Sequence, residues 1–215
     1  MRLFCQMAKS RRLELKKGGA MRIVHVAVTV FCAVLLAGCL PVTSKTPVGT
    51  TAGLGADSAL FGTWKGHSPD SDNKADGFFH FMLAKDGSMT VALILAKGTS
   101  DDGWTIFNAH TAKLGDNHYL NAVETFDKDA PAEGDLKNAN IPLLYVVKGR
   151  TLTLYLLDED KTKEAVKTGL ITGKIEPGDM GDVVLTADGP ELDAFMAKPQ
   201  AAGMFKVLMV LKKVD

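Results

Sequence analysis

The chain has 215 residues, with 25 Lys and Arg against 25 Asp and Glu and a formal net charge of +0. Residues 1–38 hold seven basic residues and one acidic residue, which leaves 18 basic and 24 acidic residues in 39–215, a net charge of about −6. This balance argues against a basic nucleic-acid-binding surface. A hydrophobic fraction of 46% with 23% charged residues excludes a wholly disordered chain.

An apolar run occupies residues 23–38 and follows directly after Arg22. A cation, an apolar stretch and then small residues are typical of a secretory signal peptide. The run is shorter than the roughly 20 residues that a membrane-spanning helix needs. We therefore predict a signal peptide over residues 1–38, with Met21 as the true start because Met21-Arg22 by itself supplies a basic start.

The apolar run ends in Leu36-Ala37-Gly38-Cys39. This motif resembles the lipobox of bacterial lipoproteins. The resemblance implies cleavage between Gly38 and Cys39, a diacylglycerol group on the Cys39 sulfur and an acyl chain on its new amino group. Because the next residue is Leu40 and not Asp, the resemblance also implies sorting to the outer membrane, with the domain facing the periplasm.

Only Cys39 of the three cysteines follows the predicted cleavage site, so the mature domain has no disulfide and no cysteine-based site. Residues 40–59 are rich in Pro, Gly, Ser and Thr and show no periodicity. This composition predicts a flexible tether with a root-mean-square span of about 25 Å. The expected organisation is a signal peptide (1–38), a lipidated cysteine with its tether (39–59) and a folded domain (60–215).

The folded domain shows short apolar segments joined by tight turns such as Lys85-Asp86-Gly87 and Gly149-Arg150, the pattern of β-hairpins. The predicted strands are 60–66, 77–84, 88–97, 103–113, 118–126, 141–148, 151–157, 170–176, 182–186 and 205–213. Two short helices are predicted at 158–168, which begins with three acidic residues, and at 190–197, which begins with Pro190. The fold class is mainly β: an antiparallel meander closed or nearly closed into a barrel, with the two helices packed on it.

The first strand contains Gly62-Thr63-Trp64, and a late helix precedes the last strand. This arrangement is similar to the lipocalin and lipocalin-like group. The resemblance implies that Gly62 and Trp64 lie at the barrel floor and that Lys212 or Lys213 contacts the Trp64 ring. It also implies a carrier of a small apolar ligand or lipid. Alternation along the strands gives the possible wall residues Phe79, Phe81, Leu93, Ile106 and Leu154.

No nucleophile elbow, zinc-protease motif or phosphate-binding loop is present, so we predict no catalytic residue. His110 and His118 flank one hairpin and could face each other as metal ligands, but we interpret them as ordinary polar strand residues and expect no metal and no cofactor beyond the lipid.

Three function classes stay open. We favour a non-enzymatic structural or protein-interaction module, whose partners are the membrane, through its lipid, and another envelope protein. The alternatives are a ligand carrier and a periplasmic hydrolase. A barrel cavity of about 300 Å³ or more with apolar walls would separate the carrier from the module.

Overall fold

The computed structural model describes residues 41–67, 69, 77–95, 103–125, 139–176 and 182–214. The chain divides into two compact units, Met1–Cys39 and Leu40–Asp215, and the described residues all belong to the second. The predicted signal peptide, the cleavage site and Cys39 lie outside the described residues.

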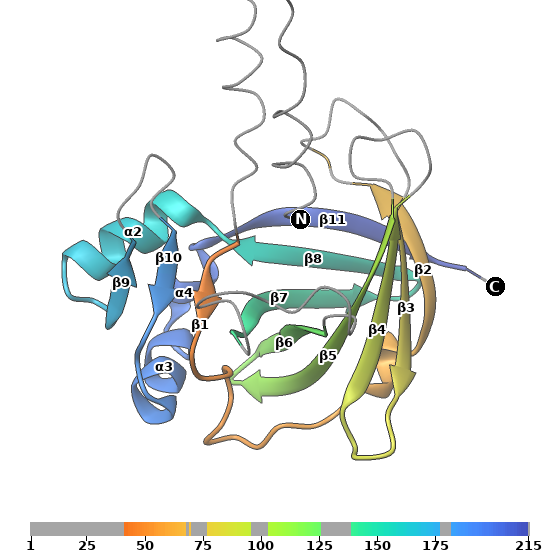
Figure 1. Ribbon diagram of the computed structural model, residues 1–215, viewed down its shortest axis with the longest axis horizontal. Helices are drawn as coiled ribbons and strands as arrows, with labels where there is room; N and C mark the ends of the chain where they lie inside the picture. The colour runs from red at the N-terminus through yellow and green to blue at the C-terminus, as the bar shows by residue number, and fades with distance from the viewer. Residues whose placement is uncertain are drawn as a thin grey trace, which may run out of the picture. The chain divides into compact units, whose positions relative to one another are not determined.

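The second unit is built on a closed antiparallel barrel of eight strands in the order β11-β2-β3-β4-β5-β6-β7-β8 (Figure 1). Strands that follow each other along the chain pair with each other, and β11 closes the barrel between β8 and β2. The predicted fold class is confirmed. The strands are β2 Gly62–His67, β3 Gly77–Leu83, β4 Met89–Leu95, β5 Gly103–Leu114, β6 Asn117–Thr125, β7 Ile141–Lys148, β8 Thr151–Leu157 and β11 Phe205–Lys213.

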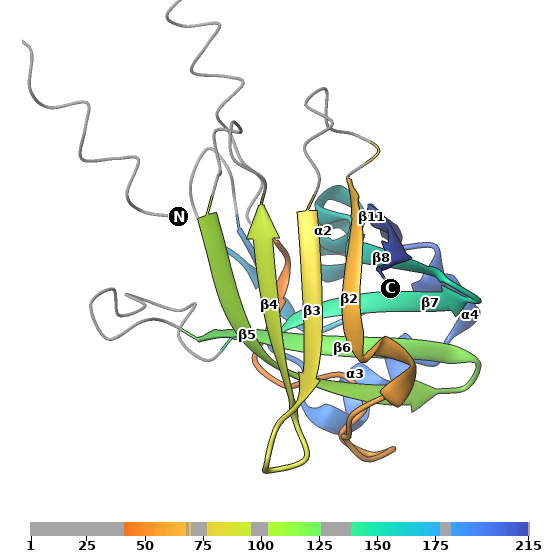
Figure 2. The same cartoon turned by 90° about the vertical axis from the view of Figure 1, so that its right-hand side faces the viewer.

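The tight turns of the sequence are the hairpins of the barrel. Gly149, between β7 and β8, has a φ of +57°, a conformation that favours glycine over residues with a side chain. The barrel has two ends. At one of them, β2 and β4 finish and β3 and β5 begin, and we call it the upper end. The opposite one is the lower end. Figure 2 shows β3, β4 and β5 side by side along this direction.

A second layer lies against one side of the barrel (Figure 1). A three-stranded sheet has the order β1-β10-β9, with β1 Thr43–Ser44 parallel to β10 Val183–Leu185, and β9 Gly173–Ile175 antiparallel to β10. The predicted strands at 170–176 and 182–186 thus exist, but outside the barrel. The helices of the second layer are α2 Glu159–Lys167, α3 Gly189–Met196 and α4 Pro199–Ala202.

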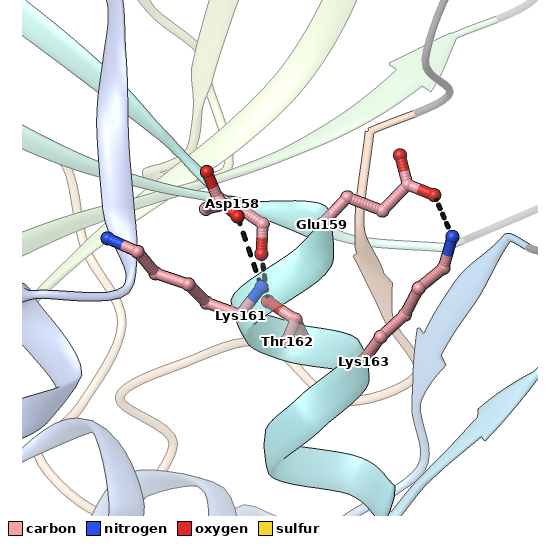
Figure 3. Close-up of polar contacts among 5 residues, drawn as sticks. All are labelled: Asp158, Glu159, Lys161, Thr162 and Lys163. Atoms are coloured by element: carbon pink, nitrogen blue, oxygen red, sulfur yellow. Dashed lines mark hydrogen bonds and ion pairs between the residues drawn. The ribbon is translucent and has the colours of Figure 1, made fainter.

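The acidic start of α2 has the role expected from the sequence (Figure 3). The Asp158 carboxylate accepts a hydrogen bond from the Lys161 backbone N–H at 3.1 Å, and Thr162 Oγ1 donates to the Asp158 carbonyl at 2.6 Å. Lys163 and Glu159 form an ion pair one turn apart at 2.5 Å. The bond from the Lys161 N–H to the Asp158 carboxylate satisfies a backbone donor that a helix start would otherwise leave without a partner.

Buried apolar side chains form two clusters. The inner core fills the barrel and contains, among others, Leu60, Trp64, Phe81, Leu152 and Leu154. The outer core lies between the barrel wall and the second layer, and its members include Val42, Val48, Tyr119, Leu192 and Phe205. Each barrel strand therefore supplies one face to the inner core, and some strands supply the other face to the outer core.

The predicted tether is wrong for residues 41–59, which we call the strap. Val42, Thr43, Ser44 and Val48 are buried, and the backbone N–H and carbonyl groups of Ser44 each bond the backbone of Asn140 at 2.8 Å. The composition did suggest irregular structure, and much of the strap is indeed turn. Its two valines, however, bury enough apolar surface to fix this irregular segment on the barrel.

Candidate functional site

The strap reaches the lower end of the barrel and leads into β2 through a 3₁₀-helix, η3 Ser58–Leu60. Just beyond it, Trp64 is 0% exposed, and its Nε1–H donates to the Leu60 carbonyl at 2.6 Å. Lys213 Nζ lies 5.1 Å from the centroid of the Trp64 ring, the cation–π contact expected from the sequence. Gly62 has a φ of +105°, which explains a glycine where the chain turns into β2.

Four of the five possible wall residues belong to the inner core or pack on it. Phe79, Phe81 and Leu154 are buried members, and Leu93 is partly buried against them. The prediction that Ile106 lines the barrel interior is wrong. It pairs with Ala92, which in turn pairs with His80, whereas the inner-core residue Val91 pairs with Phe107.

The error at Ile106 has a physical cause. Both faces of β5 carry apolar side chains, so the period of two does not say which face is inside. The pairing with β4 fixes the register and puts Phe107 against the inner core, with Ile106 on the outer face. Sequence alternation alone therefore cannot orient this strand.

An open hollow of about 420 Å³ lies at the lower end of the barrel. Its walls are strap residues 52–57, the end of β5 with Thr111 and Lys113, and His118 and Tyr145 from the next two strands. Leu54 and Tyr145 are the large apolar or aromatic side chains of these walls, and the rest is made of small or polar side chains and strap backbone. This hollow does not have the apolar walls that a carrier of lipid would need.

The polar groups of the hollow hold the strap in place. Tyr145 Oη donates to Asp57 Oδ2 at 2.7 Å, while Asp57 Oδ1 accepts from the Ala59 N–H at 2.9 Å as the N-cap of η3. The His118 ring meets the Tyr145 ring edge-on, with centroids 5.5 Å apart.

Burial, together with the hydrogen bond and charge of Asp57, raises the pKa of Tyr145 far above its usual range, so its phenol keeps the proton that it donates. Tyr145 therefore acts as a hydrogen-bond donor that links β7 to the strap.

The two histidines considered as a metal pair do not face each other. Lys113, and not His110, pairs with His118, and His110 pairs with Asn121. His110 and Lys113 are three residues apart on one strand, so they lie on opposite faces of the sheet. Within the described part of the chain, no group of three or more His, Cys, Asp or Glu side chains could hold a metal ion.

Two buried polar side chains that the sequence reading did not single out fasten the middle of the strap. Asp193, on α3, accepts hydrogen bonds from the Gly49 N–H at 2.5 Å, the Thr51 N–H at 2.7 Å and Thr51 Oγ1 at 2.6 Å. Asn121, on β6, accepts from the Val48 N–H at 2.7 Å and donates to the Val48 carbonyl at 2.8 Å. A carboxylate inside an otherwise apolar helix face is the one sequence signal for such a contact, since a buried charge needs donors.

Comparison with known proteins adds no relative: no family model, no curated protein and no solved structure matches the chain. Among the described residues, no helix has both the length and the apolar character needed to cross a membrane.

Proposed function

We propose that the chain is a lipid-anchored lipoprotein of the bacterial envelope, whose barrel is a non-enzymatic structural or protein-interaction module. The observation that supports this proposal best is the filling of the barrel. Trp64, Phe81, Met89, Leu152, Leu154 and Leu211 all project into the inner core and are fully buried. An eight-stranded barrel is just narrow enough to be filled by its own side chains.

The anchor in this proposal is the diacylglycerol on Cys39, joined by an acyl chain on the amino group. Several chains hold a protein at a membrane because each buried methylene contributes about 0.8 kcal/mol. The lipobox and Leu40 support a place on the periplasmic side of the outer membrane. No other cofactor belongs to the proposal.

Cys39→Ser tests the anchor. The variant should accumulate as an unprocessed precursor, since the sulfur is the atom that receives the lipid. Mass spectrometry of the wild-type protein should find a mature chain that begins at Cys39 and carries acyl chains. Mature protein that fractionates with inner-membrane markers would contradict the outer-membrane assignment.

Native mass spectrometry tests the packed module against the carrier. The protein, with its acyl chains removed and purified from its own host, should give the bare mass of the chain. Reproducible recovery with a bound apolar molecule would instead favour the carrier.

A further inference from the structure

Three large apolar side chains, two of them exposed and one half-buried, form a row on the outer face of the barrel near its upper end. Phe78 pairs with Ile94, and Ile94 pairs with Trp104, so the row crosses β3, β4 and β5. Trp104 is 67% exposed and Ile94 is 48% exposed. We call Phe78, Ile94 and Trp104 the rim row. Neighbouring apolar side chains that remain exposed can mark a site of contact with a membrane or with another protein.

A cation continues the rim row on the next strand. Lys65, on β2, pairs with Phe78, and its Nζ lies 5.5 Å from the centroid of the Phe78 ring. Lys212, on β11, pairs with Lys65 in turn. The face thus passes from tryptophan through aliphatic and aromatic side chains to ammonium groups. Tryptophan is enriched where a membrane meets water, and lysines reach toward the phosphate layer there.

The strap determines how far the domain lies from a lipid on Cys39. Val42 is 2% exposed, so the chain is fixed to the barrel from that residue onward. Only Leu40 and Pro41 stand between Cys39 and Val42, and three residue steps span at most about 11 Å. The lipid therefore holds the domain against the membrane surface, where a free tether would have lifted it away.

The first described residues of the strap lie near the upper end of the barrel, as does the rim row. β1 bridges through Ser44 to Asn140, which directly precedes β7, and β7 begins at the upper end of the barrel. In Figure 1, the start of β1, the end of β4 and the start of β5 all lie toward the top of the barrel. Figure 2 shows β3, β4 and β5 side by side, with their upper ends at the top of the view.

We propose that the rim row lies in the interfacial layer of the bilayer that holds the Cys39 lipid. This contact rests on the proposed lipid anchor and adds a second attachment to it. It fixes the orientation of the barrel, with the upper end toward the lipid and the lower end with its strap-lined hollow away from it.

The chain contains two tryptophans, which makes the contact measurable without a label. Trp64 is buried in the inner core and serves as the internal reference, while Trp104 reports on the rim row. The mature lipidated protein is placed in vesicles of phosphatidylethanolamine and phosphatidylglycerol that contain dibrominated phosphatidylcholine. We expect loss of the Trp104 emission to the brominated lipid and its shielding from aqueous iodide. Trp104→Phe should abolish the quenchable component.

A control tryptophan can be placed at the lower end of β3, the strand that carries Phe78 of the rim row at its upper end. Leu83, the last residue of β3, is 61% exposed and lies at the lower end of the barrel. In a Trp104→Phe, Leu83→Trp protein, the new tryptophan should stay open to iodide and escape the brominated lipid. Equal lipid quenching at positions 83 and 104, or none at 104, would overturn the rim contact.

Two further outcomes distinguish the rim contact from the lipid anchor on which it rests and from coverage of the rim row by another protein. Acyl chains on Cys39 with an unquenched Trp104 would overturn the rim contact alone, whereas their absence would overturn the anchor and the contact together. Shielding of Trp104 in native envelope membranes but not in pure lipid vesicles would show that a protein covers the rim row, which also overturns the lipid contact.

Discussion

The inner and outer cores are both apolar and buried, but they are assembled in different ways. The inner core joins side chains from strands that follow each other along the chain, as in the pairing of Phe81 with Val91. The outer core joins the strap to residues far away in sequence, and its polar contacts span 73 positions at Asn121 and 144 positions at Asp193. The barrel therefore depends on packing, and the second layer depends on a few directed hydrogen bonds as well.

The largest effect should come from the inner core. Trp64→Ala removes a fully buried aromatic ring, its hydrogen bond to Leu60 and the contact with Lys213. We expect a loss of about 3–5 kcal/mol in the free energy of unfolding, measured by urea titration. Trp104→Ala is the matched control, and because Trp104 is exposed it should cost about 0.5 kcal/mol or less. Similar losses in both variants would refute the division between core and surface tryptophan.

The outer core should respond most to loss of its carboxylate. Asp193→Ala leaves the N–H groups of Gly49 and Thr51 without their acceptor, and we expect a cost of about 2–3 kcal/mol. Limited proteolysis should then cut within the strap. Asp188→Ala removes the N-cap of the same helix, and among the described residues the Asp188 side chain makes no hydrogen bond to the strap. This variant should cost about 1 kcal/mol and leave the strap protected. Strap cleavage in both variants would show that fraying of α3, and not the lost acceptor, releases the strap.

A smaller effect is expected where the strap meets the barrel end. Tyr145→Phe removes one hydrogen bond to the Asp57 carboxylate and should cost about 1.5 kcal/mol, as is usual for a bond to a charged group. Tyr155→Phe is the control, since within the described ranges no hydrogen bond involves that hydroxyl. A change of less than about 0.5 kcal/mol is expected for it. Equal stability of the two variants would mean that the Asp57–Tyr145 contact does not hold the strap.

The smallest effect at neutral pH belongs to Tyr119, whose hydroxyl donates to the Met196 carbonyl at 2.8 Å. Tyr119→Phe should cost about 1 kcal/mol there. Burial raises the pKa of Tyr119 to about 12, although the Asn117 side chain opposes this shift. Because the folded state keeps this proton more firmly than the unfolded chain, its contribution is complete below pH 10 and is lost as the pH rises toward 12. Unfolding midpoints across this range should therefore fall less steeply in the variant than in the wild type.

The barrel could be predicted from the sequence, and the second layer only in pieces. Turn residues such as Gly149 and strand periodicity are local signals, so the meander and the two larger helices were found close to their observed bounds. The strap was missed because Val42 and Val48 show no period, and Asn121, which bonds the Val48 backbone, lies 73 residues further along the chain. At Ile106 the pattern was present but ambiguous, since both faces of β5 carry apolar side chains.

The same reasoning explains which parts of the lower end were foreseen. A contact of Lys212 or Lys213 with Trp64 was expected from the resemblance carried by Gly62-Thr63-Trp64, and the pairing of β11 with β2 brings Lys213 to the Trp64 ring. The bond between Asp57 and Tyr145 depends on the path of the strap across the barrel end. No local pattern encodes that path, so the hollow lay beyond prediction.

The parallel pairing of β1 with β10 also sets an order in time. The strap leaves the ribosome before its partners, because Val184 and Leu185 of β10 follow Thr43 and Ser44 by 141 residues and Asp193 follows them later still. Closing so long a loop carries an entropic cost that the barrel must first reduce by bringing the two segments near each other. We therefore expect the earliest segment of this unit to be the last to become fixed, with Val42 and Val48 open to a chaperone until then.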